Sequence, residues 1–251
     1  MRLLLINPNI TEATTAAMAE EARRHASPGT EVVAVSAAFG PQYVENRAEA
    51  AIAAHAVLQA LAEHGPGCDG AIVSAFGDPG LAAAREFADV PVFGIAESAM
   101  LTAWTLARRY SIVCLTQRLR RWYVECAEEH GLAGRLVSVR ALDVPIPDIT
   151  RAKDQFRDRL LAECQAAVRE DGAEAIILGG GPIAGLAREV AGEIPVPTLD
   201  GVACAVRLAE AVIGLHPRKA TVGSFARPAP KPAKGLAPAL LARITGTPPS
   251  R

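Results

Sequence analysis

The sequence predicts an α/β protein with two pseudo-symmetric lobes, each built on a four-stranded parallel sheet. Short apolar runs bounded by turn residues alternate with amphipathic stretches along the 251 residues. The order of these elements repeats in the second half, and segments of the two halves resemble each other. Strands of about five residues separated by helices of about ten or more require crossover connections, which produce parallel sheets. We therefore expect Rossmann- or flavodoxin-like lobes that arose by internal duplication.

The first half contains four apolar runs, each followed by a helical pattern. The first run ends at Asn7-Pro8-Asn9, and Thr11 is expected to cap the helix that follows. The predicted strands are 3–6, 31–37, 71–75 and 90–95, and the predicted helices are 11–25, 47–64, 79–87 and 99–107.

The same order begins again after residue 107. The predicted strands of the second half are 111–115, 136–141, 175–178 and 196–199, and the predicted helices are 118–130, 154–170, 183–190 and 202–215. "AIVSAFGDPGLAAARE" from Ala71 resembles "AIILGGGPIAGLARE" from Ala175, and a Pro-led strand follows each segment. The offset of about 105 residues is too long for a solenoid repeat and suits a domain duplication.

The chain after His216 has a different composition. Alternating prolines from Gly223 favour an extended conformation, and a short apolar patch covers 236–244. Two interpretations stay open, a loose terminus or an arm whose Leu240, Leu241 and Ile244 pack on the body or on a neighbour. The expected organisation is a first lobe at 1–107, a second lobe at 108–215 and a Pro-rich arm at 216–251, with a possible return of the chain to the first lobe.

Composition argues against several classes of partner. The formal net charge of −1 gives no electrostatic footprint for nucleic acid or an anionic membrane. The apolar stretch at the N-terminus is too short for a signal peptide, and no run of about 18 apolar residues exists. We expect a cytoplasmic homo-oligomer whose partner is a small molecule.

Cysteine and histidine patterns predict neither disulfides nor a metal site. The five cysteines are scattered without a Cys-x-x-Cys, and the five histidines fall in or near helices without metal-ligand spacing. Neither a dinucleotide fingerprint nor a phosphate-binding P-loop occurs. No cofactor and no metal are therefore expected.

The predicted site lies beyond the carboxyl ends of the strands, where open parallel sheets bind ligands. Glycines there let a ligand approach the backbone, and amides at helix starts can hold a carboxylate or imide oxygen. Pseudo-symmetry would bring the loop after residue 75 face to face with the loop after residue 178. The expected substrate-binding residues are Asn7, Pro8, Asn9, Tyr43, Ala75, Phe76, Gly77, Thr116, Gly180, Gly181 and Pro182.

Four segments carry a resemblance to a known family. "LLLINPNIT", "AFGDPGLAAARE", "GIAESAM" and "LDGVACAV" resemble the aspartate/glutamate/hydantoin racemase superfamily, most closely its hydantoin and allantoin racemases. The resemblance covers about residues 1–215, in order. It implies a cofactor-independent fold of two lobes, with chemistry at an acidic carbon of a small hydantoin, ureide or amino-acid-like substrate in the cleft between them.

The sequence departs from that family at the catalytic positions. Such racemases use two cysteines, one per lobe, because inversion needs a base and an acid on opposite faces of the carbon. The matching positions here are Ala75 and Gly180, whose side chains transfer no proton. The two-thiol mechanism therefore cannot be assumed for this chain.

Three interpretations follow from this departure. The protein is an isomerase that uses other groups, a lyase, decarboxylase or hydrolase with a backbone oxyanion site, or a ligand-binding pseudoenzyme. The carboxylates expected to take a catalytic role are Asp78, Glu97 and Asp200, although Asp78 and Glu97 also suit helix capping. Ser74 should point away from Ala75 by strand alternation and is not expected to be a nucleophile.

Overall fold

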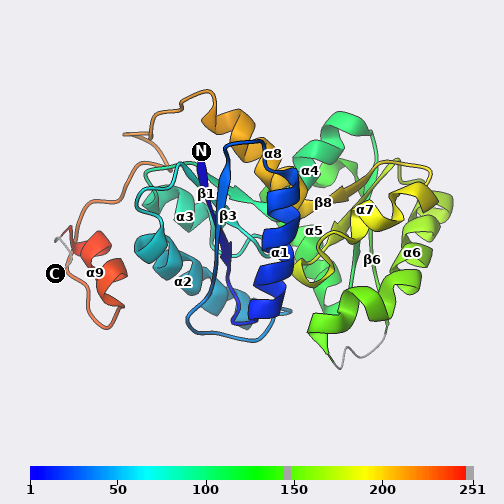
Figure 1. The fold of residues 1–251 in the computed structure, drawn as a ribbon, viewed down its shortest axis with the longest axis horizontal. Coiled ribbons are helices and arrows are strands. Elements are labelled where there is room, and N and C mark those ends of the chain that lie inside the picture. Colours follow the sequence, from blue (N-terminus) through cyan, green and yellow to red (C-terminus); the bar gives the residue numbers. More distant parts are fainter. Residues whose placement is uncertain (144–147, 247–251) are drawn as a thin grey trace.

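Two four-stranded parallel sheets form the frame of the molecule (Figure 1). The computed structural model describes residues 1–143 and 148–246. The strand orders are β2-β1-β3-β4 and β6-β5-β7-β8, so both sheets have the same order, with the first strand of each half inside. The prediction of two matching four-stranded parallel sheets is confirmed.

The elements follow the predicted order, with small shifts at their ends. The strands are β1 (Arg2–Asn7), β2 (Glu31–Ser36), β3 (Gly70–Val73), β4 (Val92–Gly94), β5 (Tyr110–Cys114), β6 (Leu136–Ala141), β7 (Ala175–Gly179) and β8 (Thr198–Asp200). The α-helices are α1 (Glu12–His25), α2 (Arg47–His64), α3 (Leu81–Phe87), α4 (Ile95–Leu106), α5 (Gln117–Glu129), α6 (Ala152–Asp171), α7 (Leu186–Val190), α8 (Gly201–Ile213) and α9 (Pro238–Thr245). The fourth helix of the first half begins at Ile95 rather than Ala99, directly after β4, so no loop separates this strand from its helix.

Strand alternation assigns the apolar residues of β1 to two different cores. Leu4 and Ile6 pack with Val57 and Leu61 of α2 and Leu81 of α3 on the outer face of the first sheet. Leu3 and Leu5 belong to the opposite face, which α1 and α8 cover. Because successive side chains of a strand point to opposite faces, one fully buried strand serves both layers.

The two halves exchange their fourth helices. Helix α8, from the second half, packs against β3 and β4 of the first sheet, and α4, from the first half, packs against β7 and β8. The two helices also pack on each other in the centre of the molecule. A single apolar cluster therefore runs between the sheets, with contributions from Ile72 and Ile112 at its two sides.

The chain after α8 returns to the first lobe as an arm. Helix α9 packs on α2, with Leu240 only 2% exposed, and Arg243 pairs with Asp89 in the loop before β4. Lys219 Nζ donates to the carbonyl oxygens of Arg85 and Glu86. The structure thus favours a packed arm over a loose terminus, and α9 is a helix that the sequence analysis did not predict. Residues 247–251 of the predicted arm lie outside the described residues.

Among residues 1–143 and 148–246, none of the helices has the length and apolar character needed to cross a membrane.

Candidate active site

A small cavity lies where the carboxyl ends of strands from both sheets approach each other. Its volume is about 50 Å³, which is room for roughly four water molecules. The residues that line it come from the loops after β1, β2, β3 and β5, from the end of β7 and the loop that follows it, from the turn before α6, and from α1 and α5. They are Asn9, Thr14, Tyr43, Val44, Glu45, Ser74, Ala75, Phe76, Leu115, Thr116, Leu119, Tyr123, Ile149, Gly179, Gly180, Gly181 and Pro182.

The loop after β3 is shaped by helix α5 of the other lobe. Gly77 has a φ of +105°, and a Cβ atom there would lie 2.7 Å from the indole of Trp122. The ring of Phe76 packs on that of Tyr123, with centroids 4.7 Å apart. Only glycine meets both the backbone and the space requirement at position 77. The first-lobe wall of the cavity is therefore held in place by α5.

The loop after β7 has the mirrored arrangement with helix α1. Gly180 has a φ of +141°, a conformation that L side chains rarely adopt. A Cβ atom at Gly181 would lie 2.8 Å from the sulfur of Met18 in α1. Each lobe therefore supports the cavity loop of the other through its first helix.

Ala75 and Gly180 both line the cavity, one from each lobe. No cysteine is among the lining residues within the described chain. All five cysteines are buried, and burial raises the pKa of Cys114 and Cys164 to about 12 and that of Cys204 to about 11. These thiols are therefore protonated near neutral pH and lie outside the cavity wall.

Several hydrogen-bonding groups along the cavity have no protein partner. The hydroxyl of Thr116 is buried and makes no hydrogen bond in the described part of the molecule. The backbone amides of Phe76 and Gly180 also have no hydrogen-bond partner among the described residues. Buried polar groups are normally paired, so free donors at a cavity are suited to a ligand with oxygen acceptors.

Polar side chains of the first lobe line or support the cavity. Asn7 is buried and donates to Asn9 Oδ1 at 3.0 Å and to Thr15 Oγ1 at 2.8 Å. Tyr43 and Glu45 line the cavity from the loop after β2. Burial raises the pKa of Tyr43, and the charges of nearby glutamates, Glu45 among them, add to this effect. Asn7 thus supports the cavity through Asn9 rather than by lining it.

The structure brings most of the predicted binding residues together. Three are not part of the lining: Asn7, Pro8 and Gly77. Thr14, Glu45, Leu119, Tyr123 and Ile149 also line the cavity, although none of them was predicted from the sequence as a site residue. Thr14, Leu119 and Tyr123 lie within α1 and α5, where the helical pattern gives no sign of a site. Glu45 and Ile149 follow segments with glycine or proline turn signals, and the segment after β2 had already indicated the neighbouring Tyr43.

The three predicted catalytic carboxylates do not line the cavity. Asp78 accepts from the amides of Ala96 (2.9 Å) and Glu97 (2.8 Å) at the start of α4. Glu97 is paired with the guanidinium of Arg85. Asp78 thus caps a helix, and Glu97 forms an ion pair. Both contacts are structural roles, and a catalytic role for either residue stays a prediction.

Asp200 caps helix α8 and anchors the loop after β7. Its carboxylate accepts from the amides of Val202, Ala203 and Gly185 at 2.8–3.1 Å. Burial raises the pKa of Asp200, while these three amide bonds act in the opposite direction. Its catalytic role also stays a prediction.

His130 links Asp78 and Glu97 to the second lobe. Its Nε2 lies 3.3 Å from Asp78 Oδ2, and its Nδ1 lies 3.6 Å from Glu97 Oε1. Burial lowers the pKa of His130, but the hydrogen bond and charge of Asp78, together with the charge of Glu97, outweigh it and raise the pKa overall.

Comparison with known proteins identifies relatives along most of the chain. The family described as Asp/Glu/Hydantoin racemase matches residues 3–209. The hydantoin racemase of Paenarthrobacter aurescens is 32% identical over 92% of this chain and 99% of its own length. That of Rhizobium meliloti is 34% identical over 94% of this chain and 98% of its own length.

Solved structures give the same result. The allantoin racemase from Klebsiella pneumoniae superposes with a TM-score of 0.91 at 36% identity, covering 96% of this chain and 98% of that one. The allantoin racemase from Pseudomonas fluorescens gives a TM-score of 0.89 at 34% identity, covering 94% and 100%. Both are two-lobed folds aligned over nearly the whole described structure.

Proposed function

This chain belongs to the Asp/Glu/hydantoin racemase family, and we propose that it isomerises a small hydantoin, ureide or amino-acid-like molecule at an acidic carbon. The observation that carries the proposal is the cavity between the lobes, which has free hydrogen-bond donors on both walls. The racemase relatives favour isomerisation over the lyase, decarboxylase, hydrolase and pseudoenzyme alternatives.

The cavity favours a small substrate. Its volume of about 50 Å³ corresponds to roughly four water molecules, so it accepts only a compact molecule. Removal of a proton beside a carbonyl places negative charge on the carbonyl oxygen. The amides of Phe76 and Gly180 and the hydroxyl of Thr116 are the free donors that would stabilise this charge.

Proton transfer must use groups other than thiols. Ala75 and Gly180 carry no acid or base, and Glu45 is the carboxylate among the lining residues. We assign the role of general base to Glu45. Asp78, Glu97 and Asp200, the carboxylates predicted from the sequence, are the alternatives that the experiment compares with it. A general acid–base group contributes roughly 10²–10⁴-fold, so a site with one base should work more slowly than one with an opposed pair.

The experiment measures deuterium uptake at C5 of 5-substituted hydantoins in D₂O. Slow exchange that is lost in Glu45→Gln and retained in Asp78→Asn, Glu97→Gln and Asp200→Asn supports the assignment. Ala75→Cys combined with Gly180→Cys tests whether a thiol pair raises the rate. No exchange by the native protein, together with no binding of hydantoins, allantoin or malonates in a thermal-shift screen, would refute the proposed function.

Assembly and location remain proposals from the sequence. A homo-oligomer would be detected by light scattering of the purified chain, and a monomer would contradict it. A cytoplasmic location is consistent with the lack of a membrane-crossing helix in the described residues and is tested by cell fractionation.

A further inference from the structure

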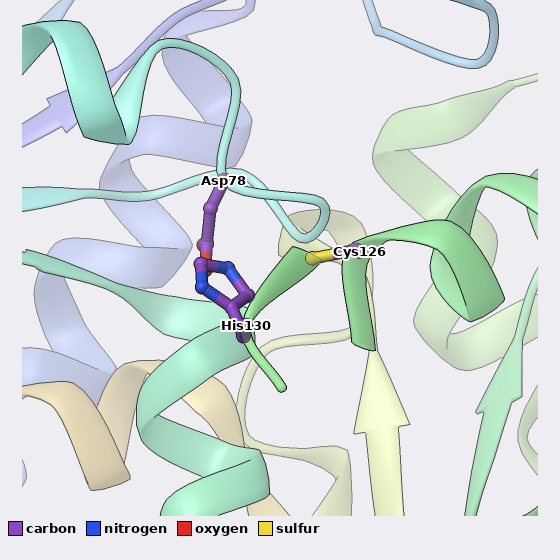
Figure 2. Close-up of side chains that lie close together, drawn as sticks. All are labelled: Asp78, Cys126 and His130. Carbon is purple, nitrogen blue, oxygen red and sulfur yellow. The ribbon is translucent and has the colours of Figure 1, made fainter. Parts of the chain in front are cut away.

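Three side chains that can each bind a metal meet at the boundary between the lobes (Figure 2). Asp78 comes from the loop after β3, and Cys126 and His130 come from α5 and the residue that follows it. Their ligand atoms, one carboxylate oxygen, Cys126 Sγ and a ring nitrogen of His130, all lie within 4.8 Å of one another. The cluster is separate from the cavity, since none of the three residues lines it.

The geometry of the cluster is close to that of a tetrahedral site. Zinc bonds of 2.0–2.3 Å place neighbouring ligand atoms roughly 3.3–3.8 Å apart. The distance from Asp78 Oδ2 to His130 Nε2 is already 3.3 Å. Cys126 and His130 are four residues apart, a spacing that puts both on the same side of a helix. Movements of about 1 Å therefore suffice to bring all three atoms to one ion.

Burial and ligand type also fit a transition metal. Asp78 and Cys126 are 6% and 1% exposed as residues, and the side chain of His130 is 15% exposed. A mixed set of imidazole, thiolate and carboxylate suits Zn²⁺ and excludes the hard cations Mg²⁺ and Ca²⁺, which take oxygen ligands.

The surrounding residues hold the ligands in place. Glu97 Oε1 lies 3.6 Å from His130 Nδ1, the ring nitrogen that does not face Asp78. Glu97 is itself fixed by Arg85, whose Nη1 lies 3.0 Å from Oε1. Histidines that bind metals almost always donate the second ring N–H to a carboxylate, a backbone carbonyl or water, and Glu97 is positioned to be such a carboxylate. Asp78 is oriented by the two amides at the start of α4.

We propose that Asp78, Cys126 and His130 form a zinc site that fastens the second lobe to the first. The three side chains supply Oδ2, Sγ and Nε2 to the ion. The thiol of Cys126 loses its proton, and the ring of His130 binds as the neutral imidazole with its remaining proton directed at Glu97. The ion fixes α5, and with it Tyr123 and Trp122, against the loop that carries Phe76 and Gly77.

The test uses the full-length chain, without affinity tag and treated with EDTA, titrated with Co²⁺ as a spectroscopic probe and then with Zn²⁺. We expect one Co²⁺ per chain, the visible bands of tetrahedral cobalt and a near-ultraviolet thiolate-to-cobalt band, all displaced by Zn²⁺. At a free zinc concentration of about 100 times the Kd, the unfolding midpoint should rise by roughly 5–10 °C.

Variants identify the ligands. Cys126→Ser should remove the charge-transfer band and weaken zinc binding at least about 100-fold, while Cys204→Ser, another buried cysteine of a helix, should leave both unchanged. Glu97→Gln should weaken binding by about 10–100-fold without loss of the band. A band that persists in Cys126→Ser overturns the proposal. Cys126 is buried, so Cys126→Ser is also checked for folding. If this variant does not fold, the measurements on the native protein decide. Absence of the thiolate-to-cobalt band, or of stabilisation by zinc, in the native protein refutes the site. Neither readout depends on racemase activity.

Discussion

The carboxylate of Asp78 occupies the space that a side chain at Gly94 would need. A Cβ atom at Gly94 would lie 2.2 Å from Asp78 Cγ. Both Gly94 and Asp200 are the residues before the fourth helix of their half. In the second half the residue at this place caps the helix itself. In the first half this residue is Gly94, which has no side chain. Asp78, from the loop after β3, caps helix α4 in its place.

This arrangement predicts that Gly94→Ala destabilises the protein although the backbone at Gly94 (φ −99°) is ordinary. The added methyl group must displace the buried carboxylate, at a cost of about 1–3 kcal/mol. The measurement is urea unfolding. Gly134→Ala is the control, because a Cβ atom there meets nothing within 4 Å. Equal stability of the two variants would show that Asp78 does not fill the space beside Gly94.

Asp200→Asn separates a structural role from a catalytic one. The amide cannot accept all three backbone hydrogen bonds with the strength of a carboxylate, so we expect a loss of about 1–3 kcal/mol. Deuterium exchange by the folded fraction should be unchanged. Loss of exchange with unchanged stability would instead support the catalytic role predicted from the sequence.

Thr116→Val should weaken ligand binding without loss of stability. The hydroxyl of Thr116 is buried at the cavity and has no partner in the described chain, so removing it costs no protein hydrogen bond. A ligand that uses it should bind about 10-fold more weakly. Ser98→Ala is the matched control, since its hydroxyl is also buried and unpaired but lies outside the lining. Calorimetric titration and thermal unfolding of both variants give the comparison.

Thiol-blocking reagents should leave activity largely intact. Every cysteine is buried, and burial raises the pKa of Cys68, Cys114, Cys126, Cys164 and Cys204. Ala75→Cys should introduce the only rapidly alkylated thiol and make activity sensitive to alkylation. Rapid inactivation of the native protein, with protection of one cysteine by substrate, would place the chemistry elsewhere.

Asp171 should make stability depend on pH in the acid range. The hydrogen bonds and charge of Arg140 lower the pKa of Asp171 below its ordinary value of 3.8. A carboxyl whose pKa is lower in the folded state stabilises above the unfolded pKa, and this stabilisation disappears as pH falls through the folded pKa. The stability difference between native protein and Asp171→Asn should therefore be present at pH 7 and shrink below about pH 4. Asp158→Asn, whose side chain is 91% exposed, is the control.

The sequence predicted the lobes and missed what depends on contact between them. A short apolar run between turn residues sufficed to predict β1 and β7, because a run of about five residues suits a buried strand better than a helix. The pseudo-symmetry of the halves and the family resemblance, rather than the strand pattern, predicted that Ala75 and Gly180 face one cavity, and both line it. Tyr123 lies within α5 and was not predicted as a site residue, because the packing of α5 on Phe76 that brings it to the cavity is a contact between the lobes.

The cluster around Asp78 shows the same limit. Cys126 lies in α5 and His130 directly follows that helix, but the third group, Asp78, lies about 50 residues earlier in the other lobe. Histidine spacing alone therefore gave no metal signal. The arm was undecided for a similar reason: a proline-rich tail predicts extended chain, and the docking of Leu240 on α2 is a tertiary contact.

The exchange of α4 and α8 determines when the protein can fold during synthesis. When the first 107 residues have left the ribosome, the inner face of the first sheet is still uncovered, because α8, which packs on β3 and β4, has not yet been synthesised. The nascent chain thus exposes apolar strand surface until residue 213 has emerged, a period in which such surface promotes aggregation. Separate expression of the two halves should yield insoluble fragments that become soluble only when both are made in the same cell.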